Sequence, residues 1–329
     1  MRTKRCRPPP AVVRVGVAQQ AVRNHVAPIG SRGTSLLRGS QVKQLIVNAD
    51  DFGANTGVNR GVLAAHEAGG LSSATLIAAG EAFVEAAALA RTAPALGVGV
   101  HLVLAGGLPP VAVPADVPTL LSADGRLWRD LGTFARRWAA GRIDPADVET
   151  EIEAQLDRVR DAGITPTHVD AHKHVFVIPG VMRRVAAVCR RRGIGAVRNP
   201  FDADPLAPGL APPGAWRRRL LQWLFGRSVR LAQPGWRRAA AGLWTPNRFY
   251  GVAATGLWTA GYLERIIAGL TSGCAELMTH PGMLDESLRA SRTRLKESRQ
   301  VELDLLCGAL PPLLARHGVT LRTFANPGA

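Results

Sequence analysis

The repeated alternation of strand-like and helix-like segments is the feature of this sequence that most limits its fold. From about residue 44 to the end, short apolar runs typical of buried strands alternate with amphipathic stretches typical of helices. Such alternation in one unit predicts an α/β protein with a parallel sheet, either a barrel or a doubly wound sheet. The predicted strands cover 44–49, 73–79, 97–104, 166–174, 275–279 and 319–324, and the predicted helices cover 58–68, 81–92, 147–162, 181–191, 261–270 and 295–306.

Length and composition exclude several other classes of protein. With 329 residues and 47% hydrophobic content, the chain can bury one large core or two modest ones and is not mostly disordered. No apolar run approaches the roughly 20 residues that a membrane-spanning helix needs. The four cysteines lie far apart with no C-x-x-C pair, which argues against a disulfide framework or a cysteine zinc site. We therefore expect a cytoplasmic protein.

The net charge of +16 is concentrated in two parts of the chain. Residues 1–43 hold nine Lys and Arg and no Asp or Glu, and Arg14 interrupts their only apolar stretch, so a secretory signal is not expected. We interpret 1–43 as a disordered leader outside the fold and 44–329 as the folded domain.

A second basic cluster forms an insert at about 202–248. No acidic residue lies between Asp204 and Glu264, and residues 216–248 hold eight arginines and four tryptophans. One apolar stripe follows a helical spacing that is typical of an amphipathic segment on an anionic membrane, which predicts peripheral membrane contact through 216–238. An ordinary helix with a solvated basic face explains the pattern equally well. The stripe consists of Trp216, Leu220, Trp223 and Leu224.

Polar side chains gather where the predicted strands end. The carboxyl ends of the strands carry the active site in βα barrels, and catalytic groups come from several strands. A doubly wound sheet would concentrate them near one switch point. The distribution therefore favours a single distorted, TIM-like β/α barrel. The residues concerned are Asp50, Asp51, His101, Asp170, His172, His174 and His280.

The segment 167–174 carries the most specific part of this pattern. On a strand, alternate side chains share one face, so His168, Asp170, His172 and His174 are predicted to lie together. Three imidazoles and a carboxylate are costly in an apolar core without partners, and a divalent metal or a polar substrate would remove that cost. Hydrogen-bonded core histidines are the alternative interpretation.

The adjacent Asp50 and Asp51 are less specific. An Asp before a helix is commonly an N-cap. Neighbouring residues point in different directions, however, so one carboxylate could bind a metal while the other takes a proton. Asp51, Phe52 and Gly53 also spell the kinase magnesium motif, but no Gly-rich loop, lysine strand or His-Arg-Asp loop precedes it, which excludes a kinase.

Four motifs together resemble the YdjC-like carbohydrate deacetylases, including the chitooligosaccharide and hopanoid-associated branches. The resemblance covers about residues 44–325. Lys173 differs from the chitooligosaccharide type and resembles the hopanoid-associated branch, and Val175-Phe176-Val177 stand where many relatives carry further histidines. Both differences bear on the substrate and not on the reaction. The motifs are LIVNADDFG at 45–53, GVHL at 99–102, THVDAHKH at 167–174 and THP at 279–281.

This resemblance implies a distorted barrel that removes acetyl groups from N-acetylated amino sugars with one divalent metal ion, Mg²⁺ or Zn²⁺. It implies Asp51, His101 and His172 as metal ligands, Asp50 as the general base and His280 as the general acid. His174, His168 and Asp170 match positions that bind substrate or orient the ligands. An acetylated sugar, as an oligosaccharide or on a lipid such as a GlcNAc-hopanoid, is the expected partner, and the sequence leaves a homodimer open.

Two other functions remain as alternatives. A metal-dependent phosphoesterase could use the same ligands. A nucleic-acid-binding protein could use the Arg and Trp residues of the insert for backbone contact and base stacking. The second alternative does not explain five histidines associated with strands, so no nucleic acid is expected as a partner.

Overall fold

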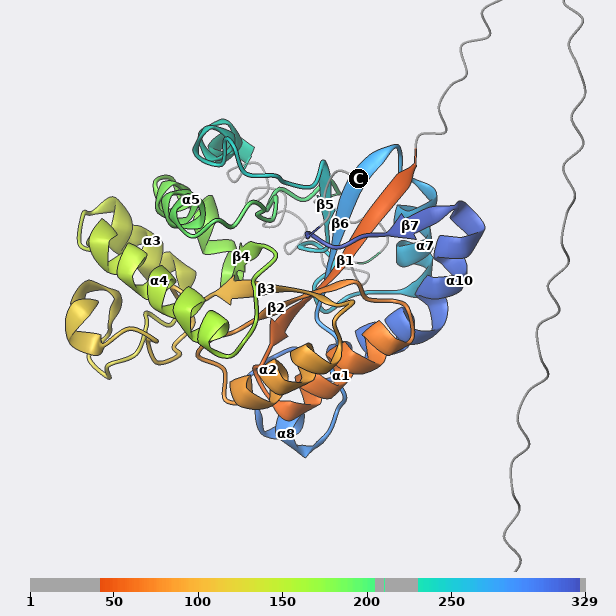
Figure 1. Ribbon diagram of the computed structural model, residues 1–329, viewed down its shortest axis with the longest axis horizontal. Helices are drawn as coiled ribbons and strands as arrows, with labels where there is room; N and C mark the ends of the chain where they lie inside the picture. The colour runs from red at the N-terminus through yellow and green to blue at the C-terminus, as the bar shows by residue number, and fades with distance from the viewer. Residues whose placement is uncertain (1–41, 205–209, 211–229, 326–329) are drawn as a thin grey trace, which may run out of the picture. The chain divides into compact units, whose positions relative to one another are not determined.

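The computed structural model describes residues 42–204, 210 and 230–325, and its centre is one parallel sheet (Figure 1). The order of the strands is β4-β3-β2-β1-β6-β5, and β7 pairs with the first residues of β1. Every strand pairing is parallel. The strands are β1 (Lys43–Phe52), β2 (Ser73–Leu76), β3 (Gly97–Leu102), β4 (Val169–Ala171), β5 (Arg248–Tyr250), β6 (Gly273–Thr279) and β7 (Val319–Leu321).

Helices connect these strands and pack against the sheet, as Figure 1 shows for α1 and α2 on one side and α7 and α10 on another. Three 3₁₀ turns cover Pro114–Asp116, Pro118–Leu120 and His172–Val177, and a π-helical turn at Leu305–Ala309 joins α9 to α10. The labelled helices are α1 (Thr56–Glu67), α2 (Phe83–Thr92), α3 (Leu131–Ala139), α4 (Pro145–Asp161), α5 (Val181–Arg191), α7 (Ala260–Ala268), α8 (Glu286–Ala290), α9 (Glu297–Asp304) and α10 (Leu310–His317). No helix in the described ranges is both long and apolar enough to cross a membrane.

The sheet curls, and the segment 196–202 lies between its two edge strands. Val197 forms a single parallel bridge with Val169 of β4, and Asp202 forms one with Phe249 of β5. The prediction of a parallel α/β fold is therefore confirmed, and the curled sheet is consistent with a distorted barrel.

The two faces of the curled sheet differ in polarity. On β1, Leu45, Val47 and Ala49 join the large apolar core, while Asn48 and Asp50 occupy the alternate positions on the opposite face. The same alternation puts buried polar side chains from several strands on that opposite face, which we call the inner face. These side chains are Asn48, Asp50, Thr75, His101, Asp170 and Glu276.

Small residues make room on the inner face. A Cβ atom added at Gly99 would lie 2.5 Å from the ring of His168, so only glycine fits beside that imidazole. The ring of His168 stacks on Phe324 with their centroids 3.7 Å apart. This close packing fixes the position of β3 relative to β4, the two strands that carry His101 and Asp170.

The structure corrects the strand predicted at 166–174. β4 ends at Ala171, and the chain continues as a 3₁₀ turn in which Lys173 and His174 have positive φ angles of 55° and 51°. His172 and His174 therefore do not share a strand face with His168 and Asp170. The prediction of one face carrying all four residues is wrong.

Helix α3 was not predicted from the sequence, and part of the predicted insert lies outside the described residues. In the insert, the stripe from Trp216 to Leu224 lies outside the described residues, as do residues 1–41 of the predicted leader 1–43. Trp236, a described member of the same insert, is 5% exposed and packs against Phe176 and Phe201. This tryptophan contributes to the core.

Candidate metal centre

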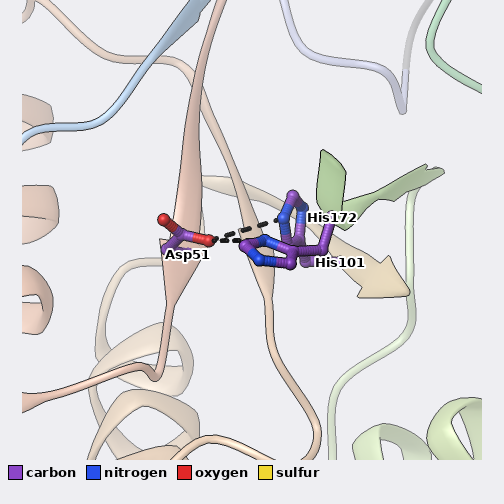
Figure 2. A group of neighbouring side chains, drawn as sticks. All are labelled: Asp51, His101 and His172. Carbon is purple, nitrogen blue, oxygen red and sulfur yellow. Dashed lines mark ion pairs between the residues drawn. The ribbon is translucent and has the colours of Figure 1, made fainter. Parts of the chain in front are cut away.

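Three ligand-type side chains converge at the carboxyl ends of β1 and β3 and just after β4 (Figure 2). Asp51 Oδ1 lies 3.5 Å from His101 Nε2 and 3.4 Å from His172 Nδ1. The side chains of Asp51 and His101 are 10% and 2% exposed, whereas that of His172 is 31% exposed. The group is thus buried on two sides and open to solvent at His172.

The backbone at this group is locally unusual. Asp51 has a φ angle of 65°, and the pairing register of β1 with β2 shifts between Ala49 and Phe52. In the described part of the chain, the non-glycine residues with positive φ are Asp51, Lys173 and His174. Such conformations cost free energy and concentrate at functional sites. All three lie in or beside the ligand group, because His172 directly precedes Lys173.

His101 is held in one orientation by its second nitrogen. Asp170 Oδ1 accepts a hydrogen bond of 2.7 Å from His101 Nδ1, and Asp170 Oδ2 accepts one of 3.0 Å from Thr75 Oγ1. Burial lowers the pKa of His101, but Asp170 and the two neighbouring aspartates outweigh it and raise the pKa to about 9. With Nδ1 bound to Asp170, Nε2 is the nitrogen that faces Asp51, and an imidazole oriented in this way is a typical metal ligand.

The separations within the group suit a small divalent cation. Ligand atoms that surround a tetrahedral cation at about 2.1 Å lie about 3.4 Å from one another. Those of Asp51, His101 and His172 all lie within 4.8 Å of one another, with two of the separations at 3.4 and 3.5 Å. One carboxylate and two imidazoles form a ligand set used for zinc and other divalent ions. These residues therefore fit a metal site.

A second group of potential ligands is already occupied by a cation of the protein. Asp50, His101 and Asp170 also lie within ligand distance of one another. Arg198, however, donates two hydrogen bonds of 2.6 Å to the oxygens of Asp50 and lies 2.7 Å from Asp170 Oδ2. The guanidinium already compensates the charge of both carboxylates in this group, which leaves the group around Asp51 as the candidate centre.

Arg198 also controls the charge of Asp50. Although burial raises the pKa of Asp50, the charge and hydrogen bonds of Arg198 hold it well below its ordinary value. Asn48 Nδ2 donates a further hydrogen bond of 3.0 Å to Asp50 Oδ1. Asp50 is thus an ionised carboxylate with a fixed orientation, directly adjacent in the chain to Asp51.

Arg198 and Glu276 were not identified from the sequence. Arg198 is completely buried, and its Nε donates a hydrogen bond of 2.6 Å to Glu276 Oε1. Burial raises the pKa of Glu276 to about 8, although Arg198 lowers it. A signal for Glu276 existed, since it is the single charge in the apolar segment 275–278 of a predicted strand. Arg198 gave none, because it lies in an irregular segment that only the fold brings to the inner face.

His280 lies at the end of β6, as predicted. Its backbone N–H donates a hydrogen bond of 2.6 Å to Glu302 Oε2 in α9, and its Nδ1 lies 3.9 Å from the same oxygen. Burial lowers the pKa of His280 to about 4, against the opposing effect of Asp50 and Asp51. Burial likewise raises the pKa of Glu302 to about 7, although the His280 N–H and Arg299 lower it. His280 is therefore a neutral imidazole at neutral pH.

Comparison with known proteins supports the interpretation of these motifs. The family model described as YdjC-like protein matches residues 44–310, which is most of the chain. The chain belongs to the YdjC-like family. The family resemblance expected from the four motifs is thus confirmed.

Relatives of this YdjC-like chain carry enzyme names. It is 33% identical to the carbohydrate deacetylase of Brevibacillus brevis (strain 47), over 87% of this chain and 100% of the relative. It is 39% identical to the chitooligosaccharide deacetylase of Enterobacter sp. (strain 638), over 86% of this chain and 99% of the relative. Among solved structures, a putative cellobiose-phosphate cleavage protein from Enterococcus faecalis V583 has the same fold, with a TM-score of 0.66 at 22% identity over 88% of this chain and 100% of that chain.

The remaining predicted site residues of the YdjC-like chain lie in three different environments. Asp170 contacts His101 directly, as described above. The ring of His168 is buried against Phe324, and burial holds its pKa well below its ordinary value. His174 lies in the turn after His172, its ring set edge-on to Phe249, and burial lowers its pKa to about 3. Both histidines are therefore neutral at neutral pH. His168 Nδ1 forms a hydrogen bond of 2.9 Å with the hydroxyl of the adjacent Thr167.

Proposed function

We propose that this chain is a metal-dependent hydrolase that removes the N-acetyl group from an N-acetylated amino sugar, carried on an oligosaccharide or a glycolipid. The observation that carries the proposal is the convergence of Asp51, His101 and His172 beside the ionised Asp50. The names of the relatives support the class of substrate and the reaction. The proposal includes a fold in which residues 44–329 form one distorted barrel with an insert at about 202–248. A cytoplasmic location, a homodimer and membrane contact through 216–238 remain predictions from the sequence.

The proposed metal ligands are Asp51 Oδ1, His101 Nε2 and His172 Nδ1. A divalent cation at this position, Mg²⁺ or Zn²⁺, supplies Lewis acidity that polarises the amide carbonyl and lowers the pKa of the attacking water. Asp170 keeps His101 Nε2 available by accepting the proton of Nδ1. The solvent-exposed side at His172 is the side from which a sugar can approach.

Two further groups handle protons in the proposed reaction. Asp50, fixed by Arg198, accepts a proton from the water that attacks the carbonyl carbon. His280 protonates the leaving nitrogen, which departs as a neutral amine while acetate forms. Because the pKa of His280 is lowered to about 4, His280 is neutral before the reaction, so the proton that it passes to the nitrogen is the one that Asp50 has removed from the water.

The test is the release of free amine from a panel of substrates. The panel contains acetylated chitooligosaccharides, a GlcNAc-bearing lipid and a phosphate ester. Each is assayed with the wild-type protein plus metal, with a chelator, and with Asp50→Asn. Asp124→Asn, at an exposed position in a turn, is the matched control. We expect metal-dependent amine release that Asp50→Asn abolishes and Asp124→Asn retains.

Each other result has a clear meaning. Absence of amine from every substrate, while metal binding is demonstrated by calorimetry, would contradict the reaction. Preferential cleavage of the phosphate ester would favour a phosphoesterase. The substrate with the highest kcat/KM identifies the carrier of the acetylated sugar.

A further inference from the structure

Arg299 of α9 is bound to the proposed metal ligand Asp51 from the side opposite the two histidines. Arg299 Nη2 donates a short hydrogen bond to Asp51 Oδ2, whereas Asp51 Oδ1 faces His101 and His172. The side chain of Arg299 is 3% exposed. The two oxygens of Asp51 are therefore divided between an arginine and the candidate metal centre.

The position of Arg299 is fixed by its surroundings. Its backbone carbonyl accepts a hydrogen bond of 3.1 Å from the N–H of Gly282, in the loop after β6. A Cβ atom added at Gly282 would lie 3.3 Å from both Cβ and Cδ of Arg299, so the arginine stem packs directly on that backbone. One turn along α9, Glu302 binds the N–H of His280 in the same loop. Helix α9 is thus tied to the loop at two places.

Asp51 is the main hydrogen-bonding partner of the guanidinium. Nε and Nη1 of Arg299 are buried and form no hydrogen bond with other residues in the described part of the chain. The nearby Glu302 compensates only part of the positive charge, because burial raises its pKa to about 7. The charge of Arg299 therefore acts mainly on Asp51 and on whatever Asp51 binds.

We propose that Arg299 is a positioning residue that makes Asp51 a one-oxygen ligand and weakens cation binding in order to keep the cation strongly electrophilic. This inference rests on the proposed function. A carboxylate that already binds a guanidinium donates less charge to a cation, and a fixed positive charge nearby repels the cation. Both effects lower affinity, and both leave the cation with more capacity to polarise a carbonyl.

The inference predicts that neutral Arg299 variants bind the cation more tightly, whereas a purely structural role predicts weaker binding. If Arg299 only supported Asp51, neutral substitutions would weaken cation binding. Under the proposal, Arg299→Gln tightens it by about tenfold or more, the order expected for removal of a unit charge a few ångströms from a dication. The same variant lowers kcat at saturating metal, because the cation is then less electrophilic.

The experiment is calorimetric titration of Mg²⁺ and Zn²⁺ into the chelator-stripped full-length chain. The variants are Arg299→Gln and Arg299→Met, which remove the charge, and Arg299→Lys, which keeps it. The matched control is Arg292→Gln, which removes a charge from an exposed position in the loop before α9. We expect a dissociation constant about tenfold lower or more for the neutral variants, and values within about threefold of wild type for Arg299→Lys and Arg292→Gln.

The outcomes separate this inference from the proposed function. Unchanged or weaker binding by a folded neutral variant, with folding verified by near-UV circular dichroism, overturns the inference. Failure of both neutral variants to fold also overturns it, since that assigns Arg299 to the stability of the fold. If the wild-type protein binds no divalent cation, the metal requirement of the proposed function fails. If the wild-type protein binds metal and releases amine but the neutral variants bind no more tightly, only the inference about Arg299 fails.

Discussion

Removal of the Arg198 side chain tests the charge network of the inner face most directly. Arg198 pairs with Asp50, Asp170 and Glu276 at 2.6 to 2.7 Å, and the three carboxylates are 4%, 0% and 0% exposed. Arg198→Met keeps most of the volume and removes the charge. Asp50 and Asp170 then lose a charged partner in a buried environment, whereas Glu276, with its pKa raised to about 8, is mostly neutral at neutral pH.

We expect Arg198→Met to lower the free energy of unfolding by about 3–5 kcal/mol, the usual cost of breaking a buried ion pair on one side. The matched control is Arg184→Met, which removes an ion pair with Glu149 at 3.1 Å from an arginine that is 43% exposed. Surface pairs of this kind contribute about 0–1 kcal/mol. Urea unfolding at neutral pH, followed by tryptophan fluorescence, measures both variants. Equal losses in the two variants would refute the assignment of Arg198 as the buried centre of the network.

Three further predictions follow from single contacts. Asp170→Asn is expected to weaken metal binding by about 10–100-fold, because the amide orients His101 less strongly than the carboxylate does. Competition with a chromophoric chelator measures the affinity. An unchanged affinity would contradict the role of Asp170 in orienting His101. Glu276→Gln is expected to stabilise the protein relative to wild type by an amount that grows as pH rises from about 5 to about 8. The reason is that the wild-type protein loses stability over that range, because the pKa of Glu276 is higher in the folded state than in the unfolded state. A difference in unfolding free energy, measured in urea, that does not change with pH would contradict this prediction. Gly99→Ala is expected to lower the melting temperature strongly, because its Cβ would lie 2.5 Å from a buried histidine ring. The control Gly195→Ala is expected to change the melting temperature little, since no atom lies within 4 Å of the added Cβ. Equal shifts of the two variants in calorimetry would be inconsistent with this packing.

The sequence predicted the elements that depend on local patterns. The strands that include Asp51 and His101 were predicted because each is an apolar run that ends in polar residues, and the structure has β1 and β3 there. The gathering of polar residues followed from the general rule that the carboxyl ends of parallel strands meet at one edge of a sheet, whereas the choice of the metal ligands rested on the family resemblance. Periodicity alone was sufficient for this part of the fold.

The prediction failed where tertiary contacts override the local pattern. Residues 172–174 alternate like a strand, yet Lys173 and His174 adopt positive φ angles in a turn. Two contacts with distant segments accompany this turn: the Lys173 ammonium donates a hydrogen bond of 2.7 Å to the carbonyl of Arg129, and the His174 ring packs against Phe249. Neither partner can be inferred from a window around His172. The turn nevertheless places His172 beside Asp51, although the strand-face geometry predicted for His172 was wrong.

The two adjacent aspartates show how one dipeptide provides two chemical environments. Asp50 points to the inner face, where Arg198 binds both of its oxygens. Asp51, turned by its positive φ, gives one oxygen to Arg299 and the other to the candidate metal centre. Arg198 and Arg299 are far from residues 50 and 51 in the sequence. Only the folded chain brings each arginine to its carboxylate, so neither pair can be predicted from the local sequence. An ionised carboxylate that takes a proton can therefore lie next to one that binds a cation, because separate guanidinium groups compensate the two negative charges in the buried site.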